Sequence, residues 1–124
     1  MTSKAVDTPK KKKPKTQRMG MVIGLKPQYL EMYKWLHADV WPAVLQRLRD
    51  SNITNYSIYL KQPENLMFAY WEYTGKNFEA DNAAIANDPV TQEWWALCGP
   101  MQQPLETRAE GEWWASMEEV FHLD

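Results

Sequence analysis

The feature that most constrains the fold is the order of strand-like and helix-like patterns along the chain. Aromatic-rich and β-branched runs predict strands, and apolar residues at three- and four-residue spacing predict helices. The expected strands are Met19–Leu25, Ile53–Leu60, Leu66–Tyr73 and Ser116–Leu123, and the expected helices are Tyr29–His37, Pro42–Asp50, Phe78–Ala86 and Asp88–Leu97. This order predicts an α+β fold of the ferredoxin-like, split βαβ kind, with helices on one face of an antiparallel sheet.

Proline and capping residues set the predicted helix limits. Pro27 and Pro89 suit the first turn of a helix, and Asp88 suits the position that caps it. Pro42 falls inside a continuous helical pattern, so it must break or kink that helix near Asp39–Trp41. Residues 102–111 read as a polar loop.

The aromatic content predicts a second copy of the chain as a partner. The chain has seven Trp, six Tyr and three Phe. Strands this rich in aromatic residues favour cover on both faces of the sheet, and a symmetric homodimer, sheet against sheet, would supply it. Trp35, Trp71 and Trp114 are expected to pack in the core or at that interface.

Charge divides the chain into a tail and a body. Residues 1–18 hold seven basic residues and one acid, whereas the remaining 106 hold seven basic and fifteen acidic residues. The tail has almost no apolar side chains, so we expect 1–18 to be disordered and 19–124 to form one domain. The acidic body argues against nucleic acid as a partner.

The lysine run Lys10–Lys13 between two prolines resembles a short nuclear localisation motif. A solvated basic leader explains the same residues, and we favour that interpretation. The single Cys excludes an internal disulfide and a zinc site built on paired Cys, which favours a reducing, cytoplasmic setting. No apolar run is long enough for a membrane helix, and no early apolar stretch resembles a signal peptide.

Few residues can carry chemistry. The sequence lacks a glycine-rich phosphate loop, a serine nucleophile elbow and a His pair at metal-binding spacing. Tyr33 and His37 are four residues apart on a predicted helix, so they share one face and form a candidate acid–base pair near neutral pH. The alternatives are a hydrogen-bonded structural His37 and a metal site that folding would have to assemble from His37 and His122. Cys98 fits inert packing better than nucleophilic chemistry.

Two adjacent tryptophan pairs, Trp94–Trp95 and Trp113–Trp114, indicate an aromatic surface. Neighbouring side chains on a helix point about 100° apart, so one of each pair is expected to line a surface, a groove or an interface. An indole ring suits the C–H face of a sugar, while its N–H can bond a hydroxyl.

Several separated segments resemble the L-rhamnose mutarotases. They are Tyr33–Pro42, Asn55–Leu60, Asn65–Tyr70, Gln92–Trp95 and Glu118–Leu123. The resemblance covers the chain from about Arg18 to Asp124. It implies a dimeric α/β-barrel and a cytoplasmic enzyme that interconverts the α and β anomers of L-rhamnose, with no metal and no cofactor.

The resemblance also assigns roles to residues. His37 falls on the family's catalytic proton donor, and Tyr33, Tyr56, Trp94 and Trp95 fall on its substrate contacts. Either tyrosine could orient the sugar or carry the second proton. L-fucose or another sugar as substrate, a non-catalytic dimeric binder of small ligands, and a cofactor-less oxygenase remain as alternatives.

Overall fold

The computed structural model describes residues 15–124. The lysine run and most of the predicted basic tail lie outside the described residues. The first strand begins at Gln17, two residues before the predicted start of the domain. Arg18 is also part of the fold, because its guanidinium donates two hydrogen bonds to the Glu119 carboxylate, at 2.6 and 3.0 Å.

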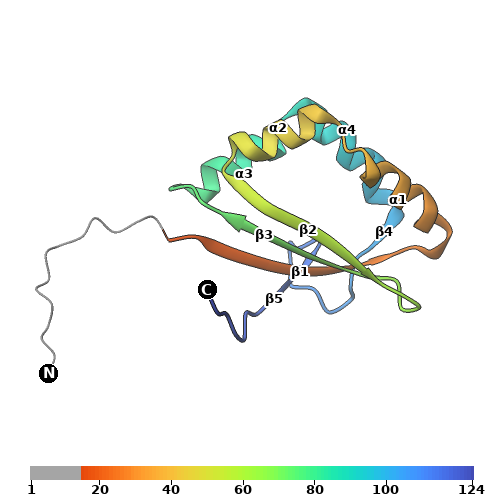
Figure 1. Cartoon of the computed structure of the whole chain (residues 1–124). Helices are drawn as coiled ribbons and strands as arrows, with labels where there is room; N and C mark the ends of the chain where they lie inside the picture. The colour runs from red at the N-terminus through yellow and green to blue at the C-terminus, as the bar shows by residue number, and fades with distance from the viewer. Residues whose placement is uncertain (1–14) are drawn as a thin grey trace, which may run out of the picture.

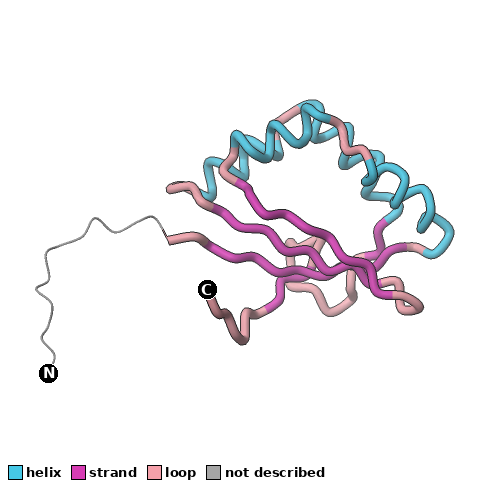
Figure 2. The backbone as a smooth tube through the Cα atoms, in the orientation of Figure 1, coloured by secondary structure: helices cyan, strands magenta, loops and turns pink. Residues whose placement is uncertain are grey.

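Five strands form one antiparallel sheet in the order β2-β3-β1-β4, with β5 also paired to β1 (Figures 1 and 2). The strands are β1 (Gln17–Leu25), β2 (Ile53–Lys61), β3 (Leu66–Tyr73), β4 (Gln102–Gln103) and β5 (Ala115–Met117). The pairing of β1 with β3 runs without a break from Gln17 opposite Tyr73 to Gly24 opposite Leu66. The order of elements confirms the predicted α+β, split βαβ arrangement.

The helices cover one face of the sheet, and the C-terminal segment lies on the other side of it (Figure 1). They are α1 (Leu30–Ala38), α2 (Pro42–Asp50), α3 (Phe78–Ala86) and α4 (Pro89–Cys98), with 3₁₀ turns η1 (Pro27–Tyr29) and η2 (Gly99–Met101). Pro42 starts α2, as predicted, and the Asp88 side chain caps α4 by accepting from Thr91 N at 2.9 Å. Within residues 15–124, no helix has the length and apolar character needed to cross a membrane.

The core lies between the helices and the sheet. Its main cluster is made of buried residues from β1, α1, α2, β3, α4 and η2, namely Ile23, Leu25, Tyr33, Val44, Met67, Trp94, Cys98 and Met101. A smaller cluster of Ile53, Tyr73 and Ile85 packs under α3. Trp71 and Trp114 pack against these clusters as predicted, but Trp35 is 72 % exposed and takes no part in the core.

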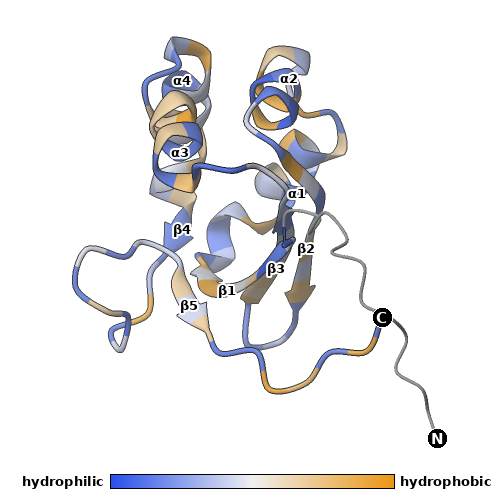
Figure 3. Cartoon of the chain, turned by 90° about the vertical axis from the view of Figure 1, so that its left-hand side faces the viewer, coloured by the Kyte–Doolittle hydropathy of each residue, from blue (hydrophilic) through white to orange (hydrophobic). Residues whose placement is uncertain are grey.

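The predicted last strand, Ser116–Leu123, is wrong in its extent. Only Ala115–Met117 pairs with β1, and Val120, Phe121 and Leu123 lie exposed in the segment beyond it, whose hydrophobic residues are visible in Figure 3. Beyond Met117 no strand pairing is present, and the contact with β1 continues only through the Arg18–Glu119 side-chain ion pair. The predicted polar loop also begins differently, since Gln102–Gln103 forms β4.

We predict that Gly24→Ala lowers the free energy of unfolding by about 1–3 kcal/mol, as overpacking does. A Cβ at Gly24 would lie 2.7 Å from the backbone oxygen of Gln103, so β4 would have to move. Gly20→Ala is the matched control in the same strand, because its Cβ would meet only Met117 Cε, at 3.6 Å. Urea unfolding of both variants measures the difference. Equal stability of the two variants would contradict the prediction.

Candidate functional site

The structure brings all five predicted site residues to one cavity of about 590 Å³, between the helices and the sheet. Tyr33 and His37 come from α1, Tyr56 from β2, and Trp94 and Trp95 from α4. The volume lies within the range of about 300–1,000 Å³ that is usual for small-molecule sites. Among the described residues, no Asp, Glu, Lys or Arg lines this cavity. His37 is therefore the one lining side chain whose ordinary pKa lies near neutrality.

The His37 ring is held in one orientation at the end of α1. Its Nδ1 donates to the backbone oxygen of Tyr33 at 2.9 Å, and because a carbonyl only accepts, Nδ1 carries the hydrogen. The ring stacks on the Tyr33 ring, with centroids 4.1 Å apart, and meets the edge of Trp94 at 5.2 Å. In the neutral imidazole, Nε2 then has a free lone pair and can accept a proton.

Burial sets the protonation state of His37. It lowers the pKa below the ordinary value of 6.5, because the charged ring would lose hydration, and the hydrogen bond to the Tyr33 oxygen offsets part of that shift. The neutral ring therefore predominates at neutral pH.

The Tyr33 hydroxyl is buried and bonded to a residue that the sequence did not reveal. Gln102 Nε2 donates to Tyr33 Oη at 3.0 Å, and Gln102 Oε1 accepts from Trp113 Nε1 at 2.7 Å. Burial raises the pKa of Tyr33 well above its usual range, although the Gln102 bond opposes this shift. Tyr33 therefore keeps its hydroxyl hydrogen at neutral pH.

Tyr56 enters the cavity beside an irregularity in β2. The pairing of β2 with β3 shifts between Thr54 and Ser57, and Asn55 adopts a left-handed conformation with φ of 50°. Tyr56 is 42 % exposed as a residue, but desolvation of its hydroxyl raises the pKa to about 12. This hydroxyl is also neutral at neutral pH.

The two tryptophans of α4 lie in different environments, as the helix geometry predicts. Trp94 is 6 % exposed and packs edge-on against His37 and Trp41, whereas Trp95 is 48 % exposed. Both line the cavity, and both also line a smaller hollow of about 170 Å³ on the side of α2 and α3. Trp94 therefore belongs both to the core and to the cavity wall, whereas Trp95 belongs to the cavity wall alone.

Sequence reasoning missed Gln102 and did not assign Trp113 or Trp114 to this cavity, although all three line it. The Trp113–Trp114 pair was a usable indication, because adjacent tryptophans predict an exposed aromatic surface. Nothing in the sequence distinguishes Gln102 from the polar residues that follow it.

The remaining candidates for chemistry do not form a reactive centre. Cys98 lines the cavity, but burial raises its pKa to about 11, so its thiol stays protonated. His122 lies in the exposed C-terminal segment, where its Nε2 is 2.7 Å from Asp124 Oδ1. Within residues 15–124, no three His, Cys, Asp or Glu side chains lie close enough together to hold a metal ion.

We predict that Trp94→Ala lowers the free energy of unfolding by about 3–5 kcal/mol, the usual result of emptying a core aromatic position. Trp95→Ala, its neighbour on the same helix, should change stability by less than about 1 kcal/mol, because it removes few buried contacts. Thermal or urea unfolding of the two variants tests this. A Trp95 variant as unstable as the Trp94 variant would contradict the assignment of the two rings.

Comparisons with known proteins agree on one family. A family model described as L-rhamnose mutarotase matches residues 18–123. A curated L-rhamnose mutarotase of Lactiplantibacillus plantarum is 33 % identical over 107 residues, which cover 86 % of this chain and 98 % of that protein. One from Sinorhizobium fredii is 35 % identical over 100 residues, covering 80 % and 90 % of the two chains. The crystal structure of L-rhamnose mutarotase from Formosa agariphila matches with a TM-score of 0.69 at 24 % identity, over 87 % of this chain and 99 % of that one, which supports the fold.

Proposed function

Because the chain belongs to the L-rhamnose mutarotase family, we propose that it interconverts the α and β anomers of L-rhamnose. The observation that carries the proposal is His37, a neutral imidazole whose Nε2 has no hydrogen-bond partner within residues 15–124. It lies in a cavity whose other described lining side chains are aromatic or uncharged. Anomer interconversion needs proton transfers alone, and an imidazole can both accept and donate a proton.

The proposed reaction opens and recloses the pyranose ring. Nε2 of His37 accepts the proton of the anomeric hydroxyl, the C1–oxygen bond to the ring breaks, and the electron pair left on O1 forms the aldehyde. The imidazolium then gives its proton to the former ring oxygen, so His37 is the proton donor in that step. The aldehyde turns about C1–C2, and the same steps in reverse close the ring on its other face.

The tyrosines and tryptophans bind the sugar in this proposal. Burial keeps the hydroxyls of Tyr33 and Tyr56 protonated, so they can donate hydrogen bonds to sugar oxygens but are poor bases. Trp95 offers an accessible ring for the apolar face of the sugar, and Trp94 closes the wall beside His37. A 6-deoxy sugar such as L-rhamnose adds a methyl group to that apolar face.

We also propose that two copies pack sheet against sheet in the cytoplasm. Tyr59 is exposed and lies between Ile58 and Leu60, which pack against the core, so it is on the sheet face away from the helices. Val120, Phe121 and Leu123 are exposed beyond β5. A second copy would cover such side chains. The cytoplasmic setting is supported by the single cysteine, which excludes an internal disulfide.

Light scattering of residues 15–124 should give twice the mass of one chain.

We predict that His37→Ala lowers the enzyme-dependent anomer exchange of L-rhamnose by about 10²–10⁴-fold, the usual contribution of an acid–base group. Saturation-transfer NMR between the two anomeric protons measures this exchange, with the buffer rate subtracted. His122→Ala is the matched control and should exchange like the wild type, because His122 lies outside the cavity. A folded His37→Ala protein with nearly wild-type exchange would remove His37 from the mechanism. The same assay with L-fucose tests the alternative sugar, and binding without exchange of any sugar would indicate a non-catalytic binder.

The lowered pKa of His37 fixes the expected pH dependence. The enzyme-dependent rate should be flat across neutral pH and fall as the pH drops below 6.5 through the lowered pKa, because protonation occupies Nε2. Exchange measured from acid to neutral pH, with buffer catalysis subtracted at each point, tests this. A rate that rises as the pH falls would mean that the imidazolium, and not the neutral ring, starts the reaction.

A further inference from the structure

We propose that Gln102, held by the indole N–H of Trp113, is a positioning residue that forces the Tyr33 hydroxyl to donate its hydrogen to an oxygen of the sugar. The inference rests on the proposed function and names the residue that sets the direction of the hydrogen bond at the Tyr33 hydroxyl. The three side chains come from α1, from β4 and from the loop before β5, so only the folded chain brings them together.

The direction of both hydrogen bonds follows from the chemistry of the indole. An indole N–H can only donate, so the Gln102 atom that faces Trp113 at 2.7 Å must be its oxygen. The Gln102 amide nitrogen then faces Tyr33 at 3.0 Å, and because an NH₂ group only donates, Tyr33 Oη is the acceptor. Without Trp113, the amide could turn over and the bond to Tyr33 could reverse.

The hydrogen of the Tyr33 hydroxyl is consequently free for a ligand. Within residues 15–124, this hydroxyl donates to no protein acceptor, and Tyr33 lines the cavity beside the stacked His37 ring. Gln102 is 8 % exposed, so water has little access to the pair. A ring oxygen of a pyranose can only accept, and it gains negative charge as the C1–oxygen bond breaks. A fixed donor is worth most at such a developing charge.

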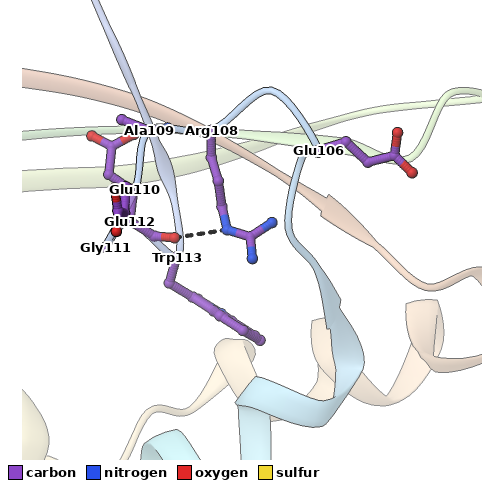
Figure 4. A pocket seen from close by; sticks show the side chains of 7 residues that line it. All are labelled: Glu106, Arg108, Ala109, Glu110, Gly111, Glu112 and Trp113. Atoms are coloured by element: carbon purple, nitrogen blue, oxygen red, sulfur yellow. Dashed lines mark hydrogen bonds between the residues drawn. The ribbon is translucent and has the colours of Figure 1, made fainter.

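The loop that carries Trp113 is built to keep the indole in place. Arg108 Nε donates to the backbone oxygen of Glu112 at 2.8 Å, and Arg108 Nη1 donates to the oxygen of Leu105 at 2.9 Å. The Glu112 carboxylate accepts from Ala109 N at 3.1 Å and from Ser116 Oγ at 2.6 Å, which ties the loop to β5. Figure 4 shows the Arg108 side chain reaching across the loop toward Glu112. The Trp113 side chain extends outward from the same loop.

Gln102→Glu gives the sharpest test. A carboxylate still accepts from Trp113, but it can only accept from Tyr33 too, so the tyrosine hydrogen turns away from the sugar. At neutral pH we expect kcat to fall by about 10²-fold, as when a fixed transition-state donor is lost, with a smaller change in KM. As the pH is lowered, the ratio of variant to wild-type rate should rise, because a protonated carboxyl can donate to Tyr33 as the amide does. A purely structural role for Gln102 would not produce this recovery.

Two further variants distinguish the effect of hydrogen-bond direction from the effect of side-chain packing. Gln102→Met removes both hydrogen bonds but leaves the Tyr33 hydroxyl hydrogen free to turn toward the sugar. We therefore expect kcat to fall by less than about tenfold. In a Tyr33→Phe background, Gln102→Glu should cost no further activity, because the hydroxyl on which it acts is gone. Circular dichroism and thermal unfolding check that each variant is folded.

The outcomes separate the two proposals. A wild-type rate in folded Gln102→Glu, or equal losses from the Glu and Met variants, overturns the role of Gln102 and leaves the mutarotase function standing. Additive losses with Tyr33→Phe overturn it as well. A wild-type protein that exchanges the anomers of neither L-rhamnose nor L-fucose overturns the proposed function, and the inference about Gln102 with it.

Discussion

The packing of Tyr33 is the constraint on which both the core and the site depend. Its ring is part of the main core cluster, its backbone oxygen accepts from His37 Nδ1, and its hydroxyl accepts from Gln102 Nε2. A buried side chain held by core packing and by a hydrogen bond at its far end has little rotational freedom. The His37 ring stacks on Tyr33 and therefore takes its position from the core, which holds the imidazole of the proposed reaction in place.

The parts of this arrangement that the sequence could predict are local. The spacing of Tyr33 and His37 placed both on one face of α1, and Pro42 correctly separated α1 from α2. The adjacency of Trp94 and Trp95 correctly implied two different environments. These inferences need only the geometry of one helix and the missing N–H of proline, so they do not depend on how the rest of the chain folds.

The parts that could not be predicted depend on contacts between distant residues. Whether a polar residue such as Gln102 is buried is decided by a tyrosine 69 positions earlier and by a tryptophan in a later loop. The last strand pairs with β1, which lies near the other end of the described chain, so its extent depends on a partner that the local pattern does not contain. Trp35 follows the helical pattern of its neighbours, yet it is exposed because it falls on the side of α1 away from the core. Local periodicity carries no information on such pairings.

One physical cause, burial in surroundings of low polarity, gives the whole cavity its chemical character. It lowers the pKa of His37 and raises the pKa values of Tyr33, Tyr56 and Cys98, so every titratable group that lines the cavity is neutral at neutral pH. An uncharged sugar can enter such a site without any ionic group losing its partner or its water. Charge appears only as the ring opens, and in a medium of low polarity it interacts strongly with dipoles that are already aimed at it. The proposed reaction therefore needs no charged residue in the cavity, because the packing that stabilises the fold also makes fixed neutral donors effective.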